Sequence, residues 1–295
     1  KGLVISYQNR SIPTNVPPLY SLVLFPLYLI SREIRFFYIT NVLLTIASTI
    51  LFYKIITKLF TSKILKSILF LAFATNYIIY WYPSVAMAEN LLTPLYLLSI
   101  WVILQPLTVT TILLASFLTM AFFATKYIAW ILSISLIIVI VIKIISLKTT
   151  LHRKYILSAL FFSVLVGFFI FFAFIEYLNK GISTFNVVLG NLQQLVGVWL
   201  INTNTVTFSK FYIKDNIVQY LSGIMGGLVT VAGKNFIIIP TTVGMVSIAA
   251  IFTNLFSRKN RLLSFYFLIS IIGTLYFIST FYVVDARYLF EFIPV

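Results

Sequence analysis

The chain has 295 residues, of which 61% are hydrophobic, 17% aromatic and only 9% charged, and its mean hydropathy is +1.07. Soluble domains contain roughly 45–50% apolar and 25% charged residues, so this composition excludes a soluble globular protein and indicates an integral membrane protein. The formal net charge is +15, but the basic residues lie in short breaks between apolar runs and not along one stripe, which argues against nucleic acid as a partner.

The first sixteen residues are polar and predict a loop. Pro17 and Pro18 then open a short apolar stretch that is interrupted by Pro26 and ends at Ile30. This stretch is shorter than the roughly 20 residues that a helix needs to cross a hydrocarbon core, so it predicts a juxtamembrane or re-entrant helix. The chain opens at KGLVISYQNR and ends at EFIPV within an apparent helix, so we expect both ends to be truncated.

The apolar runs that follow predict an all-α polytopic bundle, treated as a single domain over residues 1–295, because helices satisfy their backbone groups internally. Gln105 and Pro106 divide the long uncharged stretch between residues 90 and 125, since one helix of that length would be about 54 Å long. Eight transmembrane helices are predicted, at residues 36–53, 67–82, 88–104, 107–124, 127–145, 155–175, 236–256 and 262–282. A ninth helix is predicted to start near Arg287.

The basic residues predict the orientation of these helices. One set of breaks is basic and contains no acid, so the positive-inside rule makes that side cytoplasmic. All six acids fall on the other side, together with a long extracytoplasmic loop at 176–235, in which Ile217–Ala232 predicts a helix on the outer surface or, alternatively, one more full span. The cytoplasmic residues are Lys54, Lys58, Lys63, Lys66, Lys143, Lys148, Arg153, Lys154, Arg258, Lys259 and Arg261.

This topology brings four ionisable residues from distant parts of the sequence to the same outer level: Glu89, Lys126, Asp285 and Arg287. Two cations and two acids at one depth suit an anionic ligand, with the cations on a phosphate and the acids on hydroxyl groups or a divalent cation. No cofactor is certain, and no residues with metal-ligand spacing occur, since the chain has no cysteine and only His152.

Each of these residues also has a structural interpretation. Glu89 could cap its helix, with Ser84 before it. The side chains of Lys126 and Arg287 could extend to the outer headgroups. Tyr20 and Tyr288 are candidates for the substrate site, but both also suit the interfacial aromatic belt.

Four segments, in this order and spacing, resemble the GT-C superfamily of membrane glycosyltransferases, which includes protein O-mannosyltransferases and bacterial aminoarabinose transferases. The first, PTNVPPLYSLVLFPLYLI, resembles the proline-rich segment that ends the first outer loop. SVAMAENLLTPLYLLSIW is similar to the next outer turn, where an acid heads a helix. FFATKYIAW and DARYLFEFIP resemble the later lysine and arginine-tyrosine segments.

The resemblance implies a glycosyltransferase of the cell membrane that transfers a sugar from a polyprenyl-phosphate donor to a protein or glycan acceptor on the outer face. It implies that Glu89 lines the cavity, that Lys126 and Arg287 contact the lipid phosphate, and that Tyr20 shapes the wall with the two prolines before it. The family's catalytic acid lies upstream of this segment and would precede Lys1. Val16 stands where the family often has His or Lys.

A second hypothesis is a non-catalytic membrane component or a transporter, in which Glu89 and Lys126 form a gating pair. A transporter should have two matching halves with interrupted helices and charges near the middle of the bilayer. The predicted charges instead gather at the outer edge, and no halves match.

Overall fold

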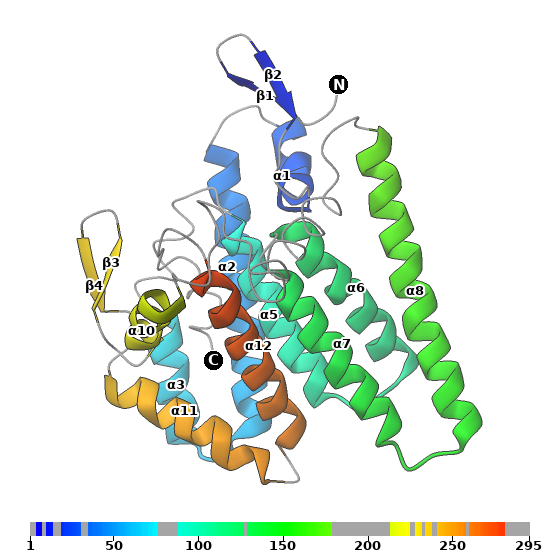
Figure 1. Ribbon diagram of the computed structural model, residues 1–295, viewed down its shortest axis with the longest axis vertical. Coiled ribbons are helices and arrows are strands. Elements are labelled where there is room, and N and C mark those ends of the chain that lie inside the picture. The colour runs from blue at the N-terminus through cyan, green and yellow to red at the C-terminus, as the bar shows by residue number, and fades with distance from the viewer. Residues whose placement is uncertain are drawn as a thin grey trace. The chain divides into compact units, whose positions relative to one another are not determined.

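The computed structural model describes helices and two short hairpins, whose arrangement within each part of the chain is drawn in Figure 1. The chain forms two compact units, residues 1–184 and residues 185–293. The described residues are 4–7, 10–13, 19–30, 35–75, 88–126, 129–178, 213–224, 228–231, 234–237, 241–257 and 260–280.

The first unit is a helical bundle preceded by a hairpin. Strands β1 (Val4–Tyr7) and β2 (Arg10–Pro13) pair antiparallel, with Ser6 opposite Ser11. The helices are α1 (Leu19–Ile30), α2 (Arg35–Leu59), α3 (Lys63–Ala74), α5 (Glu89–Leu104), α6 (Val109–Thr125), α7 (Trp130–Ile145) and α8 (Leu151–Leu178).

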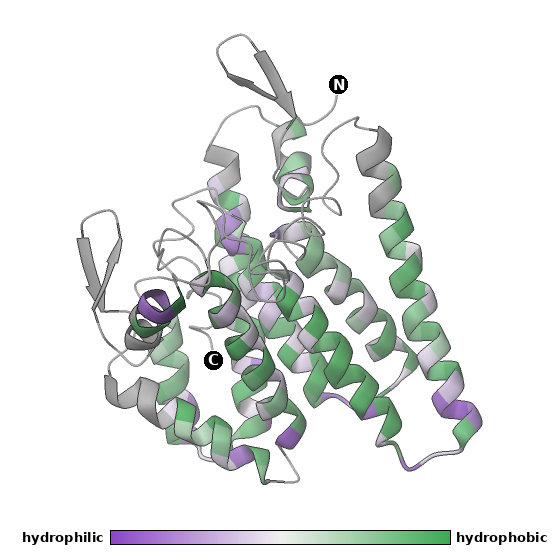
Figure 2. Cartoon of the chain, in the orientation of Figure 1, coloured by the Kyte–Doolittle hydropathy of each residue, from purple (hydrophilic) through white to green (hydrophobic). Residues whose placement is uncertain are grey.

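Helices α5 and α6 form the centre of this unit. Helix α5 packs against α2, α6 and α7, and α6 also packs against α7 and α8. Side chains such as Leu92, Ile112 and Leu118 are fully buried or nearly so, whereas α2 and α8 present large apolar side chains on their outer faces. Figure 2 shows hydrophobic residues along most of α8 and hydrophilic ones at the end that begins at Leu151. An apolar outer face around an apolar centre is the pattern of a helical bundle in lipid.

The break between α5 and α6 confirms the predicted division at Gln105 and Pro106. Gln105 ends α5 in an extended conformation, and Pro106 offers no backbone N–H to continue the helix. Thr108 then caps α6 through a capping box with Thr111, in which each side chain accepts a hydrogen bond from the other residue's backbone N–H. The two helices therefore form an antiparallel hairpin.

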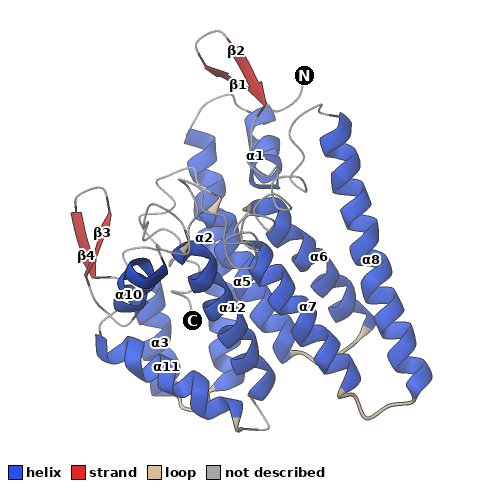
Figure 3. Cartoon of the chain, in the orientation of Figure 1, coloured by secondary structure: helices blue, strands red, loops and turns tan. Residues whose placement is uncertain are grey.

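Three described helical segments are long and apolar enough to cross a membrane: Tyr38–Leu59, Leu151–Phe171 and Arg261–Ser279. Helices α5, α6 and α7 are apolar but shorter, with 16, 17 and 16 residues. A helix of 16 residues spans about 24 Å, somewhat less than the roughly 30 Å hydrocarbon core. The chain is thus a mainly helical protein with membrane-length helices (Figure 3).

The second unit contains α10 (Ile213–Ile224), the hairpin β3 (Leu228–Val231) and β4 (Lys234–Ile237), α11 (Thr241–Leu255) and α12 (Arg261–Ser279). Helix α12 packs against α10 and α11. The Asn216 side-chain amide on α10 donates a hydrogen bond of 3.1 Å to the backbone carbonyl of Ser279, which joins α10 to the end of α12.

Three sequence predictions of secondary structure were wrong. The predicted transmembrane helix 236–256 begins in strand β4, and α11 starts only at Thr241. The first sixteen residues contain the hairpin of β1 and β2 where a loop was expected. The predicted surface helix Ile217–Ala232 begins earlier and ends at Ile224, and its last residues form strand β3. The apolar pattern was recognised, but Gly223, in the last turn of α10, lowers helix stability by about 1 kcal/mol.

Candidate functional site

The first residue of α5 and the residue that ends α6 meet at one end of the first unit. Glu89 begins α5, and Lys126 is the C-cap of α6. The antiparallel hairpin of these helices explains the meeting, because the start of the first helix lies beside the end of the second. The backbone N–H of Lys126 bonds to Phe122 O at 3.3 Å, and its carbonyl accepts a bond of 3.0 Å from the Ala129 N–H. These bonds fix the position from which the lysine side chain extends.

Glu89 and Lys126 form an ion pair in which Lys126 Nζ lies 3.1 Å from Glu89 Oε1. Only 13% of the Glu89 side chain and 16% of the Lys126 side chain is exposed. An exposed ion pair contributes little to stability because water screens it, but loss of one partner from a largely buried pair leaves a charge without compensation. The pair is therefore a local polar centre in an apolar bundle.

Tyr20, in the first turn of α1, lies beside this pair. Its hydroxyl donates a hydrogen bond of 2.7 Å to Asn41 Oδ1 on α2, and the side chain of Asn90 on α5 lies close to it. Burial raises the pKa of the Tyr20 hydroxyl above its ordinary value of 10.0, and the negative charge of Glu89 contributes in the same direction. The hydroxyl is therefore protonated at neutral pH and acts as a hydrogen-bond donor.

These five residues constitute the polar cluster: Tyr20, Asn41, Glu89, Asn90 and Lys126. They come from α1, α2, α5 and the end of α6, and Tyr20, Asn41 and Asn90 are buried. A cation, a carboxylate, amides and a phenol within reach of one another can bind a ligand that carries both a negative charge and hydroxyl groups.

The structure places three of the predicted site residues in this cluster. Glu89 and Lys126 are in contact, and Tyr20 is buried at 6% exposure. Glu89 is not the helix cap, because Ala88 occupies the N-cap position. Asp285, Arg287 and Tyr288 lie outside the described residues.

Sequence reasoning missed Asn41 and Asn90. Both are buried amides within apolar helices, and Asn41 lies in the middle of the uncharged segment FFYITNVLLT. A polar side chain in a membrane helix is costly without a partner and normally faces other protein groups. An asparagine within a predicted transmembrane helix was therefore the sequence signal that could have identified these residues, because such a side chain is expected to have a polar neighbour in the protein.

Among the described residues, no group of three or more His, Cys, Asp or Glu side chains comes together to hold a metal ion. Glu89 is the one carboxylate of the polar cluster. A divalent cation at this cluster would therefore need further ligands from its substrate or from other parts of the chain.

No protein-family model, no curated protein and no solved structure matches this chain.

Proposed function

We propose that this chain is a multi-pass glycosyltransferase of the GT-C kind, which transfers a sugar from a polyprenyl-phosphate donor to an acceptor at the outer face of the cell membrane. The observation that carries the proposal is the ion pair of Glu89 and Lys126. Glu89 comes from the segment that resembles an outer turn of that superfamily, and Lys126 comes from the segment that resembles its later lysine pattern. Tyr20, from the proline-rich segment, lies in the same cluster.

The position of the cluster in the bundle supports an outer site. Glu89 begins α5, whereas Gln105, at the other end of the helix, accepts a hydrogen bond from Lys58. The length of α5 separates the two ends by about 24 Å. Lys58 belongs to the basic breaks that the positive-inside rule assigns to the cytoplasm, so the polar cluster belongs to the opposite side.

The chemistry of the cluster suits a phosphate-linked sugar. In the transfer, an acceptor oxygen attacks the anomeric carbon, the bond from that carbon to the phosphate oxygen breaks, and the acceptor proton passes to a base. Lys126 would stabilise the negative charge that develops on the departing polyprenyl phosphate. Glu89 and the amides of the cluster would hold sugar hydroxyl groups, which orients the anomeric carbon toward the acceptor.

We assign substrate binding and charge stabilisation, and not the role of the base, to the residues of the polar cluster. The Glu89 carboxylate is already engaged by Lys126, whose Nζ lies 3.1 Å from Glu89 Oε1. Glu89 is therefore assigned to substrate binding. The resemblance separately implies that Arg287 contacts the lipid phosphate.

The proposed topology has eight or nine membrane helices. Helices α5, α6 and α7 are a few ångströms short of the hydrocarbon core, and a bilayer can thin locally at a modest free-energy cost. Because these helices lie in the centre of the first unit, flanked by α2 and α8, much of their surface contacts protein and not lipid.

The test is binding of the donor's lipid phosphate to the purified protein in detergent micelles. Polyprenyl phosphate without sugar is the probe, and its binding is measured by microscale thermophoresis. Lys126→Gln should weaken binding at least about tenfold, because a charge-assisted hydrogen bond contributes about 1.5–3 kcal/mol. Lys148→Gln removes the same charge from an exposed residue of the α7–α8 connection and should have little effect.

A second measurement separates the enzyme from the transporter. Sealed proteoliposomes receive polyprenyl-phosphate hexoses together with a mixture of peptide and glycan acceptors, and they are assayed both for free polyprenyl phosphate and for solute uptake. Release of polyprenyl phosphate that depends on Lys126 supports a transferase. Equal binding by Lys126→Gln and Lys148→Gln, or uptake without release, would contradict the proposal.

A further inference from the structure

The connection between α5 and α6 gathers hydrogen-bond donors at the end of the first unit opposite the polar cluster. The last carbonyl groups of a helix have no partner within it, and Pro106 cannot supply an N–H. Lys143, in the last turn of α7, supplies the missing hydrogen-bond donor to these carbonyl groups. Its Nζ donates to the carbonyl of Ile103 at 2.7 Å and also to the carbonyl of Gln105.

A second ammonium group reaches the same residue from another helix. Lys58, in the last turn of α2, donates a hydrogen bond of 2.7 Å to Gln105 Oε1. Lys58, Gln105 and Lys143 are called the Gln105 basic site below. Two like charges held around one residue repel each other, so an anion between them would be favoured.

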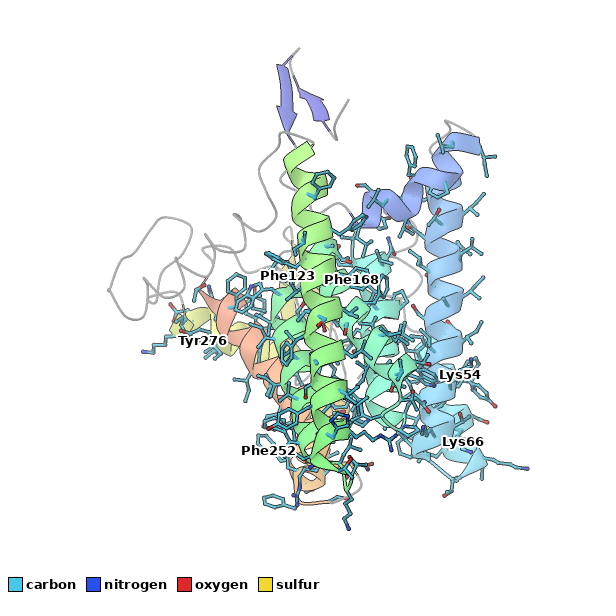
Figure 4. All side chains as sticks on the ribbon, turned by 90° about the vertical axis from the view of Figure 1, so that its right-hand side faces the viewer. Lys54, Lys66, Phe123, Phe168, Phe252 and Tyr276 are labelled. Carbon is cyan, nitrogen blue, oxygen red and sulfur yellow. The ribbon has the colours of Figure 1, made fainter. Side chains whose placement is uncertain are left out.

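No acid of this chain is near in sequence to compensate these charges. Between Glu33 and Glu89, and between Glu89 and Glu176, the chain contains no Asp or Glu. Within the described part of the first unit, Glu89 lies at the other end of α5, and Glu176 lies near the C-terminal end of α8. The exposed side chain of Lys54, one turn before Lys58 on α2, adds to the positive charge, and Figure 4 shows it on the same side of the unit as Lys66.

The Gln105 basic site has donors left over for a ligand. An ammonium group has three N–H bonds, of which Lys143 uses two and Lys58 one in the described contacts. Because Gln105 Oε1 accepts from Lys58, the amide NH₂ of Gln105 remains as a donor. The N-terminus of α6, which begins four residues later at Val109, adds the positive end of a helix dipole.

We propose that the Gln105 basic site binds the phosphodiester headgroup of an anionic phospholipid. A lipid fits because α2 carries exposed apolar side chains along the turns that lead to Lys58, among them Ile46, Ile50 and Tyr53. Acyl chains can lie along this face while the headgroup meets the two ammonium groups, as in other basic pockets between membrane helices. This site is separate from the polar cluster and does not depend on the proposed function.

The experiment measures retention of lipid by the purified full chain. Delipidated protein in detergent is mixed with phosphatidylglycerol or with phosphatidylcholine, and bound lipid is counted by native mass spectrometry. Wild-type protein should retain phosphatidylglycerol and not phosphatidylcholine. Lys58→Gln should weaken retention at least about tenfold, which corresponds to the loss of one charge-assisted hydrogen bond.

The control is Lys63→Gln, which removes an equal charge at the start of α3. Lys63 is exposed and makes no side-chain hydrogen bond in the described contacts. Its loss should weaken retention at most about fivefold, the diffuse effect of one lysine near an anionic surface. Lys58 is the residue chosen for substitution. Lys143 also donates hydrogen bonds to the carbonyl groups that end α5, so a Lys143 variant would disturb the fold.

Three results would overturn the proposal. Equal losses from Lys58→Gln and Lys63→Gln would mean diffuse attraction without a site. Equal retention of phosphatidylcholine would mean that the headgroup charge is not recognised. Displacement of phosphatidylglycerol by millimolar inorganic phosphate would assign the site to a soluble phosphate and not to a lipid.

Discussion

Lys126 Nζ lies 3.1 Å from Glu89 Oε1, although 37 positions separate the two residues in the sequence. The contact closes the open end of the hairpin formed by α5 and α6. It also explains how a carboxylate and an ammonium group can both persist in a largely buried part of the bundle, because each lowers the cost of burying the other.

Breaking this pair from either side should destabilise the protein. Glu89→Gln leaves a largely buried ammonium group without its carboxylate, so we expect the free energy of unfolding to fall by about 1–3 kcal/mol. Thermal unfolding in detergent micelles, followed by intrinsic fluorescence, measures the change. Lys126→Met should cause a loss of similar size.

The double variant Glu89→Gln with Lys126→Met tests whether these losses come from the pair. Removing both charges leaves no uncompensated ion, so the combined loss should be clearly smaller than the sum of the two single losses. Additive losses would show that the two side chains act independently, which would contradict a stabilising ion pair.

Tyr20 should contribute to stability through its hydroxyl group. Tyr20→Phe retains the buried ring but removes the hydroxyl that donates a hydrogen bond to the side chain of Asn41. We expect a loss of about 1–2 kcal/mol, as for buried polar groups that lose a partner. Tyr38→Phe is the matched control, because Tyr38 is 41% exposed on α2 and its loss should leave the unfolding temperature unchanged.

The raised pKa of Tyr20 also predicts a dependence on pH. Burial raises the pKa in the folded state above the ordinary value of 10.0, so the folded protein holds this proton more tightly than the unfolded chain. The resulting stability is fully present below pH 10 and is lost as the pH rises from there toward the folded pKa. In that range the unfolding temperature of wild-type protein should fall more steeply than that of Tyr20→Phe. Parallel curves would contradict this assignment.

The sequence predicted the helices more successfully than the polar contacts. Long apolar runs and a helix-breaking pair such as Gln105 and Pro106 are local signals, so the boundary between α5 and α6 could be read directly. The meeting of Glu89 and Lys126 was also accessible, because antiparallel helices of similar length bring the start of one beside the end of the other. Their role in binding remains a prediction.

Other features depend on tertiary packing and could not be read from local pattern. Asn41 has no sequence neighbour that explains its burial, since its partner Tyr20 lies on the preceding helix. Lys143 was predicted only as a cytoplasmic marker, whereas it binds the carbonyl groups that end α5. The hairpin of β3 and β4 follows a glycine-rich segment whose hydrophobicity resembles that of a helix. Composition alone does not distinguish a helix from a β-hairpin in this segment.

The orientation of the bundle can be tested with single cysteines, because the chain contains none of its own. Lys148→Cys places a thiol at an exposed position in the α7–α8 connection, and Lys180→Cys places one in the predicted outer loop. If the basic breaks face the cytoplasm, a membrane-impermeant maleimide added to intact cells should label Lys180→Cys and not Lys148→Cys. Lysis before labelling should make both thiols reactive. Labelling of Lys148→Cys in intact cells would show that the orientation is opposite to the predicted one. The polar cluster would then lie on the cytoplasmic side, where a donor presented at the outer face could not reach Lys126.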